Sequence, residues 1–287
     1  PLYSSAASDV YKRQEIISAM GKMSFASRDT ANATNIYNEM LKDKDCTIFL
    51  TLAGSTSAAG CMHIYRDMVK YNMVDAIVAT GASIIDMDFF EALGFKHYQG
   101  SQFQNDDELR KNYIDRIYDT YIDEDELQKC DKIIGEIADK LEPRPYTSRE
   151  FIKEIGKYLK TNAKKKESLI EVAYDNNVPI FCPAFTDSSA GFGLVMHQER
   201  NPKKHITIDS IREFRELTEI KIKSKGSGLF MIGGGVPKNF IQDTVICAEL
   251  LGKNVDMHKY AIQITVADSR DGACSLSLIH ISEPTRR

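Results

Sequence analysis

The sequence predicts an α/β protein with a doubly wound, mostly parallel, Rossmann-like sheet and helices on both faces. Five short apolar runs end in small residues and lead into helical patterns. The first four runs are nearly continuous in apolar character, which is typical of parallel strands covered on both faces. Repetition of strand, loop and helix implies right-handed crossovers and therefore a sheet of this kind.

The expected elements follow from these patterns in chain order. The five strands are expected at Thr47–Leu52, Asp75–Ala79, Pro179–Cys182, Gly228–Ile232 and Tyr260–Val266. Helices are expected at Ala58–Tyr71, Asp107–Tyr121, Glu124–Leu141, Ser148–Leu159, Lys166–Asn176, Ser210–Lys223 and Pro237–Leu251. Thr147 or Ser148 is the expected cap of one helix, Asp209 caps another, and Pro237 suits a first helical position.

Composition excludes several classes of protein. The 287 residues are 43% hydrophobic and 27% charged, which is ordinary for a globular protein and unlike disordered or fibrous chains. The net charge of −4 gives no electrostatic footprint for nucleic acid or an anionic membrane. No apolar run approaches the ~18 residues of a membrane span. We therefore expect a cytoplasmic protein, an enzyme or a binding domain.

The cysteines and histidines show no metal-ligand or redox spacing. No two of the six cysteines are separated by two residues, and those in apolar runs, such as Cys46, Cys182 and Cys247, are expected to be buried free thiols. His63 lies in a predicted helix and is expected to be a packed side chain. The sequence therefore predicts no metal site.

The two ends differ from the rest of the chain. Residues 1–14 are rich in Ser and Ala, and residues 276–287 continue no earlier pattern. We expect both segments to be non-native, although frayed natural termini would look similar. Residues 15–275 are expected to form a single domain, in which about 96–170 is a mostly helical insertion.

The loops after the expected strands favour a nucleotide ligand. Ala53–Ser57, Thr80–Ser83 and Pro183–Ser189 contain small and hydroxyl residues, which let a ligand approach the backbone and suit phosphate oxygens. In doubly wound sheets the ligand lies outside the carboxyl ends of the strands, where these loops would gather. Gly233–Lys238 is neither a dinucleotide fingerprint nor a P-loop, and alone it could be structural.

Several motifs in order resemble the deoxyhypusine synthase family. They are Phe25–Arg28, Cys46–Leu50, Met73–Asp75, Val178–Asp187 and Gly233–Lys238. The resemblance covers roughly residues 15–275. It implies a doubly wound homotetramer with sites at subunit interfaces, and an NAD-dependent aminobutyltransferase. Members oxidise spermidine with NAD, hold the four-carbon imine on a lysine, and pass it to a protein lysine or to putrescine before reducing it.

The resemblance also implies which residues bind NAD. The expected cofactor contacts are Gly54, Ser55, Thr56, Ser57, Ala58, Thr80, Gly81, Ala82, Asp86, Asp187, Gly234, Val266, Ala267 and Asp271. Asp187 has an alternative interpretation as a helix cap, because it lies in a Thr-Asp-Ser-Ser run. At Asp86 the deoxyhypusine-forming members usually have a longer acid.

The amine-binding side departs from the family pattern. The expected substrate contacts are Asp86, Asn239, Asp243, Gly272 and Cys274. Phe192 and Cys274 replace two family carboxylates, and Asn239 replaces a histidine. Asp243 lies one helical turn beyond Asn239 and could restore a negative charge there. Because a desolvated ammonium needs anions or acceptors, the substrate could be another polyamine or a guanidino amine.

The family's nucleophilic lysine is not found in this sequence. It lies in a Trp-Gly-Lys motif a short distance beyond the position of Ser275, and the chain contains no tryptophan. Lys238 matches a different family position; it could contact an anion or Asp243, or be a surface lysine. We therefore expect no catalytic residue here and no completed transfer. The alternative is a non-catalytic NAD-binding or nucleotide-binding relative, whereas a sirtuin-type deacylase would need zinc cysteines that are missing.

Overall fold

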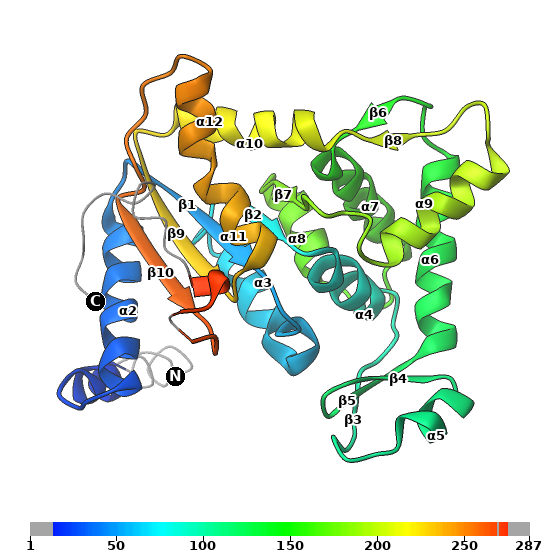
Figure 1. Ribbon diagram of the computed structural model, residues 1–287, viewed down its shortest axis with the longest axis horizontal. Coiled ribbons are helices and arrows are strands. Elements are labelled where there is room, and N and C mark those ends of the chain that lie inside the picture. The colour runs from blue at the N-terminus through cyan, green and yellow to red at the C-terminus, as the bar shows by residue number, and fades with distance from the viewer. Residues whose placement is uncertain (1–13, 269, 275–287) are drawn as a thin grey trace, which may run out of the picture.

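A five-stranded parallel sheet forms the centre of the molecule (Figure 1), and the computed structural model describes residues 14–268 and 270–274. The order is β10-β9-β1-β2-β7, and every neighbouring pair runs parallel. The strands are β1 (Cys46–Leu52), β2 (Ala76–Ala79), β7 (Ile180–Phe181), β9 (Gly226–Ile232) and β10 (Tyr260–Ile264). They coincide with the five predicted runs, so the predicted sheet is confirmed.

The strand order makes the sheet doubly wound. Read from β7, the strands follow as the third, second, first, fourth and fifth of the sheet in chain order. The chain therefore begins in the middle at β1, builds outward through β2 to β7, and returns to the other side of β1 with β9 and β10. The reversal point lies between β1 and β9, which is where doubly wound sheets hold their ligands.

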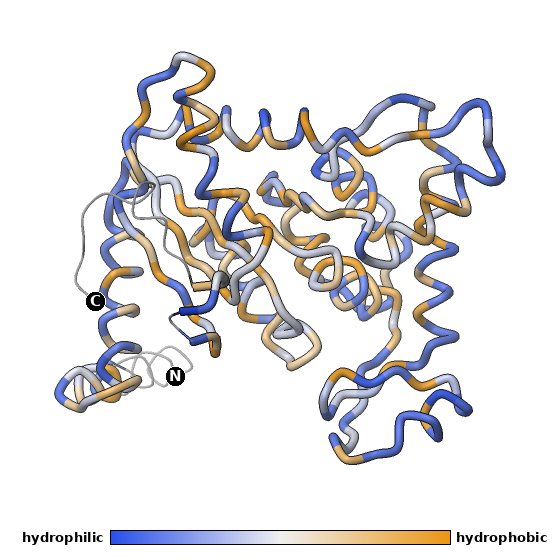
Figure 2. The backbone as a smooth tube through the Cα atoms, viewed as in Figure 1, coloured by the Kyte–Doolittle hydropathy of each residue, from blue (hydrophilic) through white to orange (hydrophobic). Residues whose placement is uncertain are grey.

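Both faces of the sheet are covered, as predicted. Leu50 belongs to the larger core cluster, which contains residues of α3 (Met62–Lys70), α7 (Ser148–Asn162) and α8 (Leu169–Asn176). The adjacent Phe49 belongs to a smaller cluster with residues of α10 (Ser210–Lys223) and α11 (Gly235–Gln242). Successive residues of a strand point to opposite faces, so β1 contributes to both clusters. Figure 2 shows hydrophobic residues concentrated along these strands.

Further elements flank this centre. α2 (Ala26–Lys42) lies beside β10, while α6 (Glu124–Asp139) and α9 (Ser189–Arg200) pack against each other beyond the β7 edge (Figure 1). Two short strands, β6 (Pro145–Tyr146) and β8 (Thr207–Ile208), pair in parallel. Among the described residues, no helix combines the length and apolar character needed to cross a bilayer.

The predicted helix Asp107–Tyr121 is wrong. The structure has a short helix, α5 (Asp106–Lys111), followed by an antiparallel sheet of β3 (Tyr98–Gln99), β4 (Ile114–Ile117) and β5 (Thr120–Asp123). Tyr113 and Tyr118 have φ of 56° and 55°, which is left-handed backbone that an α-helix cannot contain. Segment 96–170 thus holds this small sheet as well as α5, α6, α7 and the start of α8.

The predicted helix Pro237–Leu251 is two helices. α11 ends at Gln242, Asp243 forms the junction, and α12 runs over Thr244–Leu250. Helix α11 begins at Gly235, so Pro237 is its third residue and not its first. The predicted caps Thr147 and Asp209 are confirmed, because their side chains accept hydrogen bonds from the N–H groups of Glu150 and Arg212.

Candidate active site

The loops after the parallel strands meet at the carboxyl edge of the sheet. The Ala53 N–H donates to the Ile232 carbonyl at 2.9 Å, which joins the end of β1 to the end of β9. The Thr80 N–H donates to the Leu52 carbonyl at 3.0 Å, and the Gly233 N–H donates to the Ile264 carbonyl at 2.8 Å. Four of the five strand ends are therefore connected directly by backbone hydrogen bonds.

The loop Gly54–Ala58 leads from β1 into a π-helical turn, η1 (Ser57–Cys61), at the start of α3. Gly54 has φ of 77°, and its carbonyl accepts a hydrogen bond from the Ser83 hydroxyl at 3.2 Å. The Thr56 hydroxyl accepts from the Tyr65 hydroxyl at 2.8 Å. Ser57 is 2% exposed, and its buried hydroxyl has no hydrogen-bond partner among the described residues. Such a hydroxyl is suited to a ligand group, because an unpaired buried polar atom is costly.

The second loop starts a longer π-helical segment, η2 (Ala82–Phe89), that continues into α4 (Phe90–Ala92). The Thr80 hydroxyl donates to Ser83 Oγ at 3.0 Å and accepts from the Ser83 N–H at 3.3 Å. A Cβ atom added to Gly81 would lie 2.5 Å from Ser188 Oγ. The absence of a side chain at Gly81 thus lets the β2 and β7 loops touch.

Asp86 projects from η2 toward the loop that follows β7. Its Oδ1 accepts a hydrogen bond from the Ser189 N–H at 2.7 Å. Burial, assisted by the negative charges of Asp131 and Asp187, raises the pKa of Asp86 to about 6. Because like charges disfavour ionisation, a cation placed among these carboxylates would lower that pKa and be held in return.

Asp187 is exposed and is not the cap of α9. The cap is Ser188, whose side-chain oxygen accepts a hydrogen bond from the Ala190 N–H at 3.3 Å. The alternative interpretation of Asp187 as a helix cap is therefore wrong. Its carboxylate is available at the edge of the site, next to Asp86.

Asp131 is a site residue that sequence reasoning missed. It comes from α6, shares a side-chain hydrogen bond with Ser189, and burial raises its pKa. Its Oδ1 is buried without a hydrogen-bond partner among the described residues. No sequence signal indicates this position, because α6 reaches the site only through its packing against α9 and η2.

Helix α11 carries the candidate residues on the other side of the crevice. Gly234 is its N-cap, and Asn239 and Asp243 are exposed. Lys238 is 0% exposed, so its interpretation as a surface lysine is wrong. Burial lowers the pKa of Lys238, while Cys274 and Asp243 act against that shift. The predicted amine-binding residues Asp243 and Cys274 therefore lie near Lys238.

The last candidate residues follow β10. Val266 is exposed and Ala267 is half-buried. The Cys274 thiol donates to the Ala267 carbonyl at 3.4 Å, and the Asp271 N–H donates to the Asp268 carbonyl at 2.9 Å. Gly272 begins a single 3₁₀ turn (Gly272–Cys274) and is exposed. This segment closes back on the end of β10, at the same edge as the other loops.

Several other residues singled out in the sequence have surroundings that differ from those expected or lie on the surface. Phe192 is 67% exposed on α9. His63 is exposed and bonded to Arg66 at 2.9 Å, so its prediction as a packed side chain is wrong. Cys182 is buried as predicted, whereas Cys46 and Cys247 are only half-buried, and all are free thiols. Within residues 14–268 and 270–274, no group of three or more His, Cys, Asp or Glu side chains is arranged so that it could hold a metal ion.

A family model described as "DS: Deoxyhypusine synthase" matches residues 15–280. The chain belongs to the deoxyhypusine synthase family. It is 70% identical over 270 residues to a "Deoxyhypusine synthase-like protein" of Coxiella burnetii, which covers 94% of this chain and 77% of that protein. A protein of the same name from Caulobacter vibrioides is 66% identical over 273 residues, covering 94% of this chain and 74% of that one.

More distant relatives agree with this family assignment. The "Probable deoxyhypusine synthase 2" of Methanosarcina acetivorans is 41% identical over 251 residues, covering 88% of this chain and 72% of that one. The solved structure described as "Crystal Structure of a putative deoxyhypusine synthase from Entamoeba histolytica" superposes with a TM-score of 0.62 at 22% identity, covering 90% of this chain and 88% of that one. At that identity the structural match shows the fold.

Proposed function

We propose that this protein belongs to an NAD-dependent aminobutyl transfer system. The donor would be spermidine or a related amine, and the acceptor a protein lysine or putrescine. The proposal rests on one observation. A loop of glycine and hydroxyl residues lies at the same edge of the sheet as three carboxylates. The loop is Gly54–Ala58, and the carboxylates are Asp86, Asp131 and Asp187.

The β1 and β2 loops fit a dinucleotide. The small residues of Gly54–Ala58 and Thr80–Ala82 leave the backbone accessible, and the partnerless buried hydroxyl of Ser57 could donate to a phosphate or ribose oxygen. When bound, NAD would accept a hydride from the amine, and the resulting NADH would later return that hydride. The expected contacts from the remaining loops are Asp187, Gly234, Val266, Ala267 and Asp271.

The carboxylates fit the amine side of the reaction. An ammonium group between Asp86 and Asp131 would have two anions to offset its lost hydration. Asn239, Asp243, Gly272 and Cys274 would contact the remainder of the amine. Because Phe192 and Cys274 stand where relatives are expected to have carboxylates, the related amine in this proposal would be another polyamine or a guanidino amine.

We further propose that the 287-residue chain binds its ligands without completing the transfer, since it contains no Trp-Gly-Lys motif. The related alternative is a non-catalytic NAD-binding or nucleotide-binding protein. A homotetramer in the cytoplasm is the assembly and location that the family resemblance favours. A polyamine partner would be attracted by the net charge of −4.

The proposal is tested by titrating NAD into the full chain and its Ser57→Ala variant by isothermal titration calorimetry. We expect saturable NAD binding that weakens about fivefold or more in the variant, because one hydrogen bond to the ligand is lost. Ser27→Ala changes a serine on α2, far along the chain from the loops, and should leave the affinity unchanged. Absence of saturable NAD binding would contradict the proposal.

Borohydride trapping tests whether this chain captures the aminobutyl group on one of its own lysines. The chain is incubated with NAD and spermidine, reduced with borohydride, and examined by intact mass spectrometry. We expect no covalent adduct. A trapped aminobutyl adduct would show that a lysine of this chain serves as the nucleophile and would overturn the proposed inactivity.

A further inference from the structure

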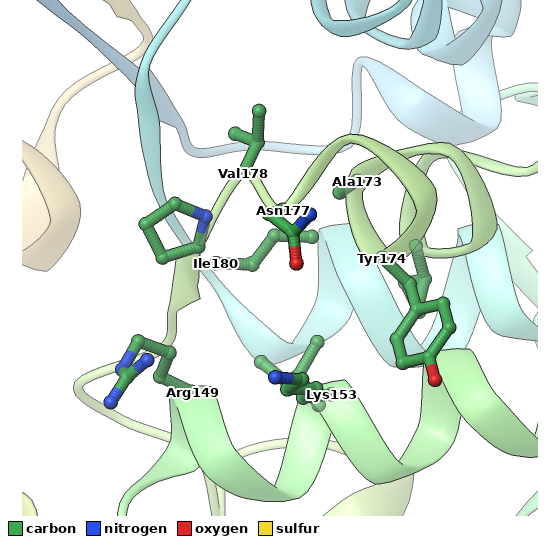
Figure 3. Close-up of a pocket in the computed structure, with 10 residues that line it drawn as sticks. Arg149, Lys153, Ala173, Tyr174, Asn177, Val178 and Ile180 are labelled. Atoms are coloured by element: carbon green, nitrogen blue, oxygen red, sulfur yellow. The ribbon is translucent and has the colours of Figure 1, made fainter.

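A cavity lies at the opposite edge of the sheet from the candidate active site. It encloses about 240 Å³ where the chain enters β7, between α7 and α8 (Figure 3). The active-site loops follow the carboxyl ends of the strands, whereas this cavity lies at the amino end of β7. Most of its wall is apolar and is formed by Ile152, Ile170, Ala173, Val178, Pro179 and Ile180.

Two cationic side chains line the same cavity. Arg149 and Lys153 come from α7 and lie along one side of the pocket in Figure 3, with Asn177 and Val178 on the other. None of the ten lining residues is acidic. Lys153 is exposed and forms no ion pair with any described residue. Its charge is therefore available to an anion that enters the cavity.

The Arg149 guanidinium is held in position on one side only. Its Nε donates to Glu216 Oε2 at 2.8 Å. Glu216 also lies 3.7 Å from the Arg212 guanidinium and accepts from the Thr147 hydroxyl at 3.3 Å, so its charge is shared. The two terminal nitrogens of Arg149 have no hydrogen-bond partner among the described residues. This leaves the two terminal nitrogens, which together can donate two parallel hydrogen bonds to one carboxylate, without a protein acceptor.

Backbone hydrogen bonds satisfy two carbonyl groups at the C-terminal end of α8, which adjoins the cavity. Asn177, at φ of 54°, terminates the helix, and its N–H donates to the Tyr174 carbonyl at 3.3 Å. The Val178 N–H donates to the Ala173 carbonyl at 3.0 Å. Two carbonyls of the last turn are thereby satisfied, which reduces the negative partial charge at this end of the helix.

We propose that this cavity binds a small organic anion, a carboxylate with a compact apolar or aromatic body. The carboxylate would lie between Arg149 and Lys153, and the body would contact Ile152, Ala173 and Pro179. The volume lies below the ~300–1,000 Å³ of pockets for drug-sized ligands, so the body would be about the size of one ring or a short branched chain. This site is separate from the proposed NAD site and does not depend on it.

Phenylacetate is the probe for this proposal, and binding to the full chain is followed by protein-observed NMR or calorimetry. We expect saturable binding, which the uncharged analogue 2-phenylethanol should show at least about tenfold more weakly, because it lacks the anion that both cations recognise. Lys153→Gln should weaken phenylacetate binding about fivefold. Phenylphosphonate tests the alternative headgroup.

The matched control is Lys157→Gln, one turn further along α7. Lys157 is also exposed but does not line the cavity, so this variant should bind phenylacetate like the unmodified chain. No saturable binding of phenylacetate, equal binding of 2-phenylethanol, or an equal loss in both lysine variants would each overturn the proposal. Binding of phenylphosphonate at least tenfold tighter than phenylacetate would overturn the assignment to a carboxylate.

Discussion

Two neighbouring acids show how local surroundings decide the effect of a carboxylate on stability. Burial, assisted by the charges of Asp131 and Asp187, raises the pKa of Asp86 to about 6. A hydrogen bond with His97 lowers the pKa of Glu91 to about 2, and Lys165 assists. The residues are only five positions apart, on η2 and α4, yet they should give opposite dependences on pH.

We expect Asp86→Asn and Glu91→Gln to change stability in opposite directions. The raised pKa means that Asp86 favours the folded state most below its unfolded pKa of 3.8, and that this advantage is lost as pH rises through about 6. Asp86→Asn should therefore gain about 2 kcal/mol relative to the unmodified chain between pH 4 and pH 7, after allowance for partial exposure. Glu91 contributes above its unfolded pKa of 4.5, so Glu91→Gln should cost about 1 kcal/mol at pH 7.

Urea unfolding at several pH values between 3 and 7 measures both effects. The cost of Glu91→Gln should shrink as pH falls below 4.5 toward 2, because protonation removes the contribution of Glu91 from the unmodified chain as well. A stability difference for Asp86→Asn that is the same at pH 4 and pH 7 would contradict the raised pKa. The two variants serve as controls for each other.

Among the structural elements, the buried strands were predictable and the outer hairpin was not. Strands β1, β2, β7 and β9 are mostly buried, so their residues form nearly continuous apolar runs with no competing period. In 107–121, by contrast, Leu109, Tyr113, Ile114 and Ile117 are spaced as on a helix face. The left-handed backbone at Tyr113 and Tyr118 produces a hairpin instead. Residues 107–121 contain no glycine, which is the usual sequence signal for such backbone.

The candidate site also contains some residues whose positions were predictable from the sequence and others whose positions were not. Residues that follow strands directly, such as Gly54, Thr80 and Gly234, were predictable because parallel strands bring their carboxyl ends to one edge. Asp131 was not, because it reaches the site on α6 through contacts between helices that are distant in sequence. The burial of Lys238 was not predictable either, and no local pattern shows that Cys274, in the segment after β10, lies near this side chain.

The start of α7 gives a prediction for one element. The Thr147 hydroxyl accepts from the Glu150 N–H at 3.2 Å, and the Glu150 carboxylate accepts from the Thr147 N–H at 3.0 Å. Thr147→Ala should lower the free energy of unfolding by about 1–2 kcal/mol, because it removes this reciprocal cap and a buried hydroxyl. Thr161→Ala, near the other end of α7, should cost less than about 0.5 kcal/mol in the same denaturant titration. Equal losses would contradict the role of the cap.

At the scale of the whole molecule, the ligand crevice depends on the approach of loops that are far apart in the sequence. β1 and β9 are adjacent in the sheet although about 180 residues separate them. A Cβ atom at Gly233 would lie 2.8 Å from the Ala53 carbonyl oxygen. The close contact of the two loops therefore requires glycine at this position, in addition to the φ of 75° that glycine adopts easily.

A comparison with Gly235 separates the energetic cost of losing this close contact from the cost of backbone strain. Its φ is 63°, but a Cβ atom there would have no neighbour within 4 Å. Gly235→Ala should therefore cost about 1 kcal/mol through strain alone, whereas Gly233→Ala should cost about 2–4 kcal/mol because it also forces the β1 and β9 loops apart. Denaturant unfolding gives both values, and NAD titration should show the larger loss of affinity for Gly233→Ala. Equal costs for the two variants would mean that the loops adjust freely, and a crevice formed by such loops would not be preorganised for a dinucleotide.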